Sequence, residues 1–403
     1  MVRRGQICST CSPDNPGAKS HNIRHPIISP LGRRLVHQLL LASCLLSVCI
    51  ASIGAERISA DLRALVEQGT REQRICAVSY AVVRAGKISQ TGGASGCDQM
   101  NPPTDDSVFQ AASLSKPVFA YAVLKLAEKG VLSLDRPLIS YLPEGYLHVQ
   151  NPFALRRPPI TDHVKAPELQ VVTARMVLSH TSGLPNWSSK PLAFDFAPGT
   201  KWQYSGEGFV LLQRVVEVIT NEKLDDFMRH QLFEPLGMSN TEFRWDKRFA
   251  ATVVPGMSSS GRPRQLVFPE AIAPASLYTT AKDYAKFLAA LMSDPKTIRR
   301  IIEAPVSVDP KHDLGWGLGW GIERSESETF LWQWGSNPGY RAFVIASTST
   351  GDAVVILTNS ENGLSIAKSI VTAALPESHS VFKFYMLREG ISYFLCENFD
   401  WCM

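Results

Sequence analysis

The sequence of 403 residues contains no Gly-x-Ser-x-Gly pentapeptide, and it has no internal repeat with a period of about 20–50 residues. The first absence excludes the nucleophile turn of α/β-hydrolases, and the second excludes solenoids and propellers. Glycine (27 residues) and proline (26 residues) are too few for a collagen-like or low-complexity chain. Charged residues make up only 19% of the chain and apolar residues 45%. A chain of this kind can bury a large core, as one large domain or two intertwined domains.

The excess of positive charge is confined to the beginning of the chain. The formal net charge is +4, but residues 1–55 hold six of the 41 Lys and Arg residues and a single acidic residue, Asp14. From Glu56 onward, 35 basic and 36 acidic residues nearly balance. Binding to a phosphate backbone requires a basic face on the folded part of a protein. The sequence therefore excludes nucleic acid as the main partner.

Residues 35–55 contain no charged side chain, and they lie between the Arg33-Arg34 pair and Glu56. A basic start, an apolar run and a small-residue end are typical of a secretory signal. The run also reaches the lower limit, about 17 residues, for a helix that spans a membrane. Because positive charge stays inside, the rest of the chain is expected outside the cytoplasm. We expect a basic extension over 1–34, a signal peptide or inner-membrane anchor over 35–55, and an exported protein that is periplasmic or secreted.

The same segment has two alternative interpretations. One is a buried core helix, although such a helix usually has a polar face. The other is attachment of a lipid at Cys44, because Leu41-Ala-Ser-Cys44 looks like a lipoprotein cleavage site.

Two of the eight cysteines, Cys76 and Cys97, flank a predicted β-hairpin. Residues 75–83 and 87–93 are apolar-rich and are joined by Ala85-Gly86, which is a turn signal. A bulge near Gly92-Gly93 would bring the two cysteines within disulfide reach. The sequence leaves two states open, a disulfide in an oxidising compartment or two buried free thiols.

Hydrophobic periodicity predicts helices in the first part and the middle of the chain and strands toward its end. This order indicates an α+β fold, in which both ends of the domain build one antiparallel sheet flanked by helices and a mostly helical subdomain is inserted. We expect the domain over 56–377, the insertion at about 140–270 and a tail without a clear pattern over 378–403. The expected elements are helices at 58–69, 115–130, 173–179, 209–220, 224–232, 280–292 and 364–374, strands at 317–322, 329–334, 340–347 and 353–359, and a loop over 143–170.

The chemistry is concentrated in Ser113-Leu-Ser-Lys116, which opens the helix expected at 115–130. One helical turn brings Ser113 and Lys116 onto the same face. A serine hydroxyl becomes nucleophilic only beside a base, and the helix N-terminus adds positive potential. The spacing alone is weak evidence, because it recurs at Ser293, Ser365 and Ser380. Of the four serines, Ser113 is the one that follows a strand-like run and begins a long helix.

The sequence segments around these residues resemble those of a known family. The segments 109–116, 177–185 (Val-Leu-Ser-His-Thr-Ser-Gly-Leu-Pro), 196–206, 233–238 and 334–341 follow one another as in the β-lactamase and penicillin-binding-protein superfamily. Within it, the chain is most similar to class C β-lactamase-related serine hydrolases, over most of residues 58–375. The resemblance implies the β-lactamase/transpeptidase-like fold, a nucleophile at Ser113, and Tyr204 as the general base alone or together with Lys116. A nearby ammonium would favour the phenolate form of Tyr204.

The resemblance fails at two motif positions. Gly206 stands where the second motif, Tyr-x-Asn, carries its amide. Gln333-Trp334-Gly335 stands where the third motif carries a cation, and a register shifted by one residue is an alternative. Gln333 cannot attract a substrate carboxylate as a lysine would. The family's oxyanion hole implies backbone N–H groups of Ser113 and Ser336, with Gly335 allowing close approach.

Other candidate residues point to structure instead of chemistry. His180 has no identifiable acidic partner, so we interpret it as structural. Asp162-His163 lacks a third ligand at a useful spacing, so neither a metal nor a cofactor is expected. Most aromatic residues near the motifs are expected in the core, with two or three lining an apolar acyl pocket. They are Trp187, Trp202, Tyr278, Trp316, Trp320, Trp332 and Trp334.

The sequence predicts a serine hydrolase that forms an acyl-enzyme on an ester, amide or β-lactam carbonyl of a small-molecule or cell-wall-type substrate. Esterase-like activity is favoured over D-amino-acid peptidase or β-lactamase activity, because the third-motif cation and the second-motif amide are missing. The alternative is a catalytically impaired binding or scaffold protein of the same fold.

Overall fold

A computed structural model describes residues 61–98, 100–153, 158–264 and 266–387 of the chain. The chain divides into two compact units, Met1–Arg57 and Ile58–Met403, and all described residues belong to the second. The expectations for 1–34 and 35–55 lie outside the described residues. Within the described ranges, no helix combines the length and the hydrophobicity needed to cross a bilayer.

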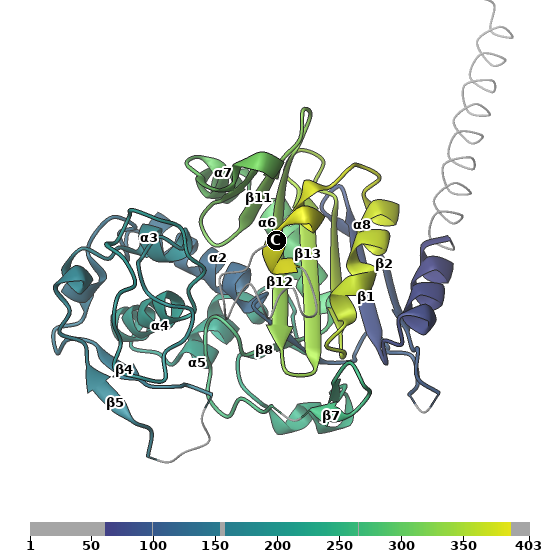
Figure 1. The fold of residues 1–403 in the computed structure, drawn as a ribbon, viewed down its shortest axis with the longest axis horizontal. Helices are drawn as coiled ribbons and strands as arrows, with labels where there is room; N and C mark the ends of the chain where they lie inside the picture. The colour runs from purple at the N-terminus through teal and green to yellow at the C-terminus, as the bar shows by residue number, and fades with distance from the viewer. Residues whose placement is uncertain (1–60, 99, 154–157, 265, 388–403) are drawn as a thin grey trace, which may run out of the picture. The chain divides into compact units, whose positions relative to one another are not determined.

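An eight-stranded antiparallel sheet forms the centre of the second unit, in the order β2-β1-β14-β13-β12-β11-β10-β9 (Figure 1). Its first two strands come from the beginning of the domain and the other six from its end, as the sequence predicts. The strands are β1 (Val78–Arg84), β2 (Lys87–Ala94), β9 (Val306–Asp309), β10 (Leu314–Trp316), β11 (Gly321–Arg324), β12 (Thr329–Asn337), β13 (Tyr340–Ser347) and β14 (Ala353–Thr358).

The strand expected at 317–322 is wrong in its position. Residues 317–320 form the turn between β10 and β11 instead. Gly319 has a φ of 85°, which a glycine adopts without the steric cost that a side chain would add. The alternation of apolar residues continues through this turn, so hydrophobicity alone did not separate the two short strands.

Both faces of the central sheet are buried. Successive side chains of a strand point to opposite faces, so each strand contributes to two cores. In β1, Ala81 belongs to the core on the face covered by helices α2 (Ser115–Glu128) and α6 (Ala281–Met292). Its neighbour Val82 belongs to the core on the other face, which α8 (Ala367–Ala374) and a helix over residues 61–72 cover. The sheet can therefore hold residues of β12 in a site with little water.

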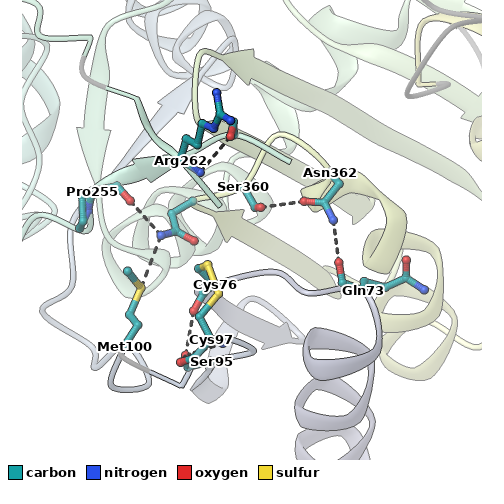
Figure 2. Close-up of a disulfide and its surroundings, with 11 residues drawn as sticks. Gln73, Cys76, Ser95, Cys97, Met100, Pro255, Arg262, Ser360 and Asn362 are labelled. Atoms are coloured by element: carbon teal, nitrogen blue, oxygen red, sulfur yellow. Dashed lines mark hydrogen bonds between the residues drawn. A yellow bond between two sulfur atoms is a disulfide. The ribbon is translucent and has the colours of Figure 1, made fainter. Parts of the chain in front are cut away.

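The cysteines that flank the β1–β2 hairpin form the disulfide Cys76–Cys97. Figure 2 shows the Ser95 hydroxyl donating hydrogen bonds to the backbone carbonyls of both cysteines. The expected bulge exists, but it lies between Val82 and Val83 and not near Gly92-Gly93. One extra residue anywhere between the turn and the cysteines shifts the register of β1 against β2 by the same amount. The disulfide pairing of Cys76 with Cys97 therefore did not depend on the position of the bulge.

The middle of the chain forms a mostly helical part beside the sheet, drawn in teal in Figure 1. Its helices are α3 (Ala174–Leu178), α4 (Glu207–Thr220) and α5 (Leu224–Met228). The segment 143–170 is not only loop, since it contains a small hairpin of β4 (Leu147–Val149) and β5 (Thr161–His163). A tertiary contact between β4 and the start of α4, described below, stabilises these two short strands.

The remaining elements are short. Strand β3 (Phe109–Ala112) pairs with β8 (Leu277–Thr279), and β6 (Gly256–Met257) pairs with β7 (Pro263–Arg264). Helix α7 (Pro295–Ile302) follows α6. Beyond residue 377, in the stretch that the sequence analysis set apart as a tail, two 3₁₀ turns cover Ser380–Lys383 and Tyr385–Leu387. A 3₁₀ turn lacks the 3.6-residue period, which explains why no pattern was visible there.

Candidate active site

Ser113 lies in the tight turn between β3 and α2, and its side chain is partly exposed. The preceding residue, Ala112, has a φ of 49°, an uncommon value for a residue with a side chain. The Ser115 hydroxyl fixes this turn by donating to the Ala112 carbonyl and accepting from the Leu277 N–H at 3.0 Å. The sequence therefore presents Ser113 at the surface of a rigid strand-to-helix connection.

Lys116 lies one helical turn away and is buried, with 1% of its surface exposed. Its Nζ is 3.2 Å from Ser113 Oγ and 3.0 Å from the Pro274 carbonyl oxygen. It also lies 4.5 Å from the centre of the Tyr204 ring. Burial lowers the pKa of Lys116 well below its usual 10.5. The buried amine therefore gives up its proton more readily than an ordinary lysine, and its neutral form has a lone pair that can accept a proton.

Tyr204 comes from the segment before α4, and its hydroxyl oxygen accepts a hydrogen bond from Gln333 Nε2 at 2.8 Å. It also shares a side-chain hydrogen bond with Ser113. Burial raises the pKa of Tyr204 well above its usual 10.0, and the bonds to Ser113 and Gln333 offset only part of this rise. Lys116 does not contribute to this shift, so the lowering of the Tyr204 pKa expected from a nearby ammonium is not found. Burial disfavours the charged form of both groups.

Gln333 of β12 points into the site and is completely buried. Its Nε2 donates to the Ser113 carbonyl oxygen at 3.2 Å as well as to Tyr204. Trp334 is 4% exposed, and its ring packs against the Tyr204 ring at a centroid distance of 4.9 Å. These two third-motif residues thus contact the candidate catalytic groups and present little surface to a substrate.

Gly335 brings β12 directly against the turn that carries Ser113. A Cβ atom at this position would lie 2.4 Å from the Ala111 carbonyl oxygen and 3.2 Å from the Ser113 nitrogen, so only glycine fits. The β12–β13 hairpin closes at Asn337 and Tyr340, and antiparallel pairs alternate between bonded and non-bonded. Ser336, next to the closing pair, therefore turns its N–H away from β13, on the side where pairing with β11 has already ended at Trp332.

His180 is buried, has a φ of 57°, and packs against the Tyr204 ring at a centroid distance of 4.4 Å. Its Nδ1 accepts a hydrogen bond from the Ser205 N–H at 3.0 Å. Burial and the neighbouring Lys116 lower the pKa of His180 well below 6.5. A neutral imidazole held in this way supports Tyr204 and the turn that follows it, which agrees with a structural interpretation.

The missing amide of the second motif has a steric explanation. A Cβ atom on Gly206 would lie 2.6 Å from the Asn186 carbonyl oxygen and 2.8 Å from the Trp187 ring. The loop containing Asn186 and Trp187 thus fills the space where a side chain at residue 206 would stand. An asparagine cannot be accommodated there without moving the loop backbone.

A second buried polar cluster lies outside this site. His148 Nδ1 is 2.9 Å from Asp162 Oδ1, and His148 Nε2 is 3.3 Å from Glu207 Oε2. Burial alone would lower the pKa of His148, but the hydrogen bonds to the two carboxylates raise it above its usual value. The cluster ties the β4–β5 hairpin to the first residue of α4. Asp162 therefore makes a structural contact with His148. The sequence analysis had considered Asp162 together with His163, as a metal-binding pair without a third ligand.

A cavity of about 850 Å³ lies on the other side of α4 and has Phe153, Val210 and Ile272 in its wall. Ser113, Lys116 and Tyr204 do not line it. Phe153 packs edge-on against Trp187 at 4.4 Å, so an aromatic layer separates the cavity from Gly206. The cavity is a neighbour of the candidate site and contributes none of its reactive groups.

The predicted site residues Ser113, Lys116, Tyr204, Gln333, Trp334 and Gly335 meet in one place. Sequence reasoning missed the Pro274 carbonyl, which belongs to a loop without a motif, and the aromatic ring of Phe384. It also gave the aromatic residues only a general role. Of these, Trp316, Trp320, Trp332 and Tyr278 are buried, while Trp187 and Trp202 are partly exposed.

We predict that Gly206→Ala destabilises the protein by about 1–3 kcal/mol, because the new Cβ meets the Asn186 backbone. The midpoint of urea unfolding measures this loss. Gly208→Ala is the matched control two residues further along the chain, since its Cβ would meet the side-chain hydroxyls of Ser182 at 3.2 Å and Ser205 at 3.3 Å instead of a backbone atom. Equal losses for the two variants would mean that the loop at Asn186 yields and that its position does not exclude a side chain.

The chain is similar to several known proteins. Esterase EstB from Burkholderia gladioli is 27% identical, with 76% of this chain and 92% of that protein covered. Penicillin-binding protein 4* from Bacillus subtilis is 25% identical, with 68% of this chain and 66% of that protein covered. The solved D-amino acid amidase from Ochrobactrum anthropi SV3 superposes with a TM-score of 0.65 at 20% identity, over 81% of this chain and 99% of that chain.

The superposition shows that the fold is the expected β-lactamase/transpeptidase-like α+β architecture. The family model described as Beta-lactamase matches residues 62–375, which is nearly the whole described region. The chain therefore belongs to the β-lactamase family and is a serine hydrolase of the β-lactamase and penicillin-binding-protein type, as its motifs predicted.

Proposed function

We propose that this protein hydrolyses neutral esters through an acyl-enzyme on Ser113. The observation that carries the proposal is the distance of 3.2 Å between Ser113 Oγ and the buried amine of Lys116, whose pKa burial lowers. A serine beside a neutral amine has a base in position before any substrate arrives. The relation to Esterase EstB, which extends over 92% of that protein, supports the same class of substrate.

In the first half of the reaction, Ser113 Oγ attacks the ester carbonyl carbon and its proton passes to Lys116 Nζ. The carbonyl oxygen becomes an oxyanion that the N–H groups of Ser113 and Ser336 stabilise, each by about 3 kcal/mol in comparable enzymes. The Tyr204 phenol donates its proton to the departing alkoxide and regains one from the Lys116 ammonium. The products are the free alcohol, the acyl-enzyme and a neutral Lys116.

In the second half, water attacks the acyl carbon and the same groups act in the reverse direction. Lys116, directly or through Tyr204, accepts the water proton, and Ser113 leaves with a proton when the acid is released. In this scheme Tyr204 is a proton shuttle and Lys116 is the base, a division that follows from the opposite pKa shifts of the two groups.

The neutral third motif is the argument for substrates without a carboxylate. Gln333 is completely buried and its amide is already bonded to Ser113 and Tyr204. It therefore offers no charge to a penicillin carboxylate or to the carboxyl end of a cell-wall peptide. A short acyl ester requires only the nucleophile, the base and the oxyanion hole.

The competing hypothesis, an impaired binding protein of the same fold, rests on the departures at Gly206 and Gln333. Two observations count against it. The space at Gly206 is filled by the loop at Asn186 and Trp187, so no pocket is left there for the missing amide. Gln333 supplies a hydrogen bond to Tyr204 in place of the cation.

We expect Ser113→Ala to lower turnover of a short-chain aryl acetate by about 10³-fold or more, because the variant lacks the nucleophile. Ser365→Ala is the matched control, since Ser365 begins another Ser-x-x-Lys on the exposed surface. A fluorophosphonate probe should label wild type and Ser365→Ala but not Ser113→Ala. Equal turnover in all three proteins would show that Ser113 is not the nucleophile. Faster reaction with a fluorescent penicillin than with the ester would contradict the proposed substrate class.

The pH dependence of the activity should reflect the lowered pKa of Lys116. Lys116 must be unprotonated to act as a base, so activity rises as the pH passes its pKa, which burial lowers well below 10.5. Tyr204 must stay protonated, and burial raises its pKa, so no alkaline loss is expected below about pH 10. We therefore predict that kcat/KM rises with pH and reaches its plateau below the usual lysine pKa of 10.5. A rate that still rises tenfold per pH unit at about pH 10 would contradict the lowered pKa of Lys116. The variant Lys116→Arg, which stays charged, should be inactive throughout.

We further propose that the protein is exported, with residues 35–55 as the signal peptide or inner-membrane anchor. The uncharged run between Arg34 and Glu56 supports this location. The Cys76–Cys97 disulfide agrees with it, because disulfides persist in oxidising compartments.

A fusion of residues 1–60 to a reporter enzyme that is active only outside the cytoplasm should be active. The matched control replaces Leu45 and Leu46 by Asp, which interrupts the apolar run and should silence the reporter. A silent wild-type fusion would contradict the proposed export.

A further inference from the structure

We propose that Phe384, in the C-terminal segment 379–387, supports the active site, because its ring completes the aromatic packing that holds Tyr204 in position beside Ser113. This inference rests on the proposed function, in which Tyr204 transfers protons. It assigns a role to residues that lie beyond the end of the family match at residue 375. Phe384 acts through Trp334 and is therefore a positioning residue.

Tyr204 is held by rings as well as by its hydrogen bond to Gln333. Its ring lies 4.9 Å from the Trp334 ring and 5.8 Å from the Trp316 ring. These rings contact further aromatic side chains, and together they form a continuous group that we call the aromatic cage. The cage consists of Trp202, Trp316, Trp332, Trp334 and Phe384.

Phe384 occupies a central position in the aromatic cage. Its ring centre lies 5.4 Å from Trp332, 5.8 Å from Trp334 and 6.2 Å from Trp202. The side chain is completely buried, although the residue lies near the end of the described chain. One ring therefore contacts three of the four tryptophans of the cage, including Trp334, which packs against Tyr204.

A buried carboxylate anchors the segment to the sheet. Glu323 of β11 is 2% exposed. Its Oε1 accepts hydrogen bonds from the Ser380 N–H, from the Ser380 hydroxyl at 2.9 Å and from the Val381 N–H at 3.1 Å. Its Oε2 lies 3.1 Å from His379 Nδ1. A buried carboxylate without such donors would be very unfavourable, so the sheet and the segment depend on each other.

Loss of the Phe384 ring would leave a cavity beside three tryptophans. Surrounding side chains only partly fill such a space, so Trp334 would gain freedom to move. Tyr204 would then lose one side of its packing, while Ser113, Lys116 and the oxyanion donors would remain in position. Because a displacement of about 1 Å of a catalytic group can lower a rate 10²-fold, we expect an effect on kcat without an effect on substrate binding.

The test compares Phe384→Ala with Phe384→Leu and with Phe382→Ala. Phe382 lies on the same segment, is partly buried and packs against Phe343 of β13, away from the cage. With an aryl acetate well below the unfolding midpoint of each variant, kcat of Phe384→Ala should fall about 10- to 100-fold at unchanged KM. Phe384→Leu should recover most of the loss and Phe382→Ala should keep the wild-type kcat. An unchanged kcat in Phe384→Ala, or an equal loss in Phe382→Ala, would overturn the inference.

A second measurement does not depend on turnover. Four of the eight tryptophans of the chain belong to the aromatic cage. Acrylamide should quench the tryptophan fluorescence of Phe384→Ala more strongly than that of wild type or Phe382→Ala, because the cage is open. If wild type fails to hydrolyse esters, the proposed function fails, and the quenching experiment still decides whether the segment closes the cage. Equal quenching in the three folded proteins would contradict the inference.

Discussion

An ammonium group that is removed from water must find a counter-charge or give up its proton, and Lys116 is removed from water almost completely. Among the described residues, its neighbours are the Ser113 hydroxyl, the Pro274 carbonyl and the rings of Tyr204 and Phe209. None of these is an anion. Burial therefore lowers the pKa of Lys116, and in its neutral form an amine 3.2 Å from a serine hydroxyl can act as a base. The chemistry that we propose follows from this single act of burial.

Several distant parts of the chain cooperate to keep water away from Lys116. The turn between β3 and α2 supplies Ser113 and Lys116, and the segment before α4 supplies Tyr204. Strand β12 supplies Gln333 and Trp334. The C-terminal segment then adds Phe384 behind Trp334. Because the central sheet is buried on both faces, it can carry such apolar and aromatic side chains next to a reactive centre.

The two departures from the family motifs have different physical meanings. At residue 206 the side chain is absent because a neighbouring loop occupies its place. At residue 333 the cation is replaced by an amide that turns inward and bonds to Tyr204. An ammonium at residue 333 would stand in the fully buried position of Gln333, where burial disfavours the charged form. The neutral amide avoids this cost, and it removes a charged contact for substrates at the same time.

The sequence by itself predicted the long helices and the strands β12, β13 and β14, because hydrophobic periodicity depends only on which residues alternate. It did not predict shorter elements such as β4, β5, β9 and α7. It also determined the candidate nucleophile, since Ser113 is the serine that joins a strand to a long helix, and the pairing of Cys76 with Cys97 as one of two states. The tertiary structure decided the directions in which the pKa values of Lys116 and Tyr204 shift, since burial comes from segments far away in the chain. It also decided the inward direction of Gln333, the position of the bulge in the first hairpin and the place of Phe384. These features depend on contacts between distant residues, and a linear pattern contains no information on which of them meet.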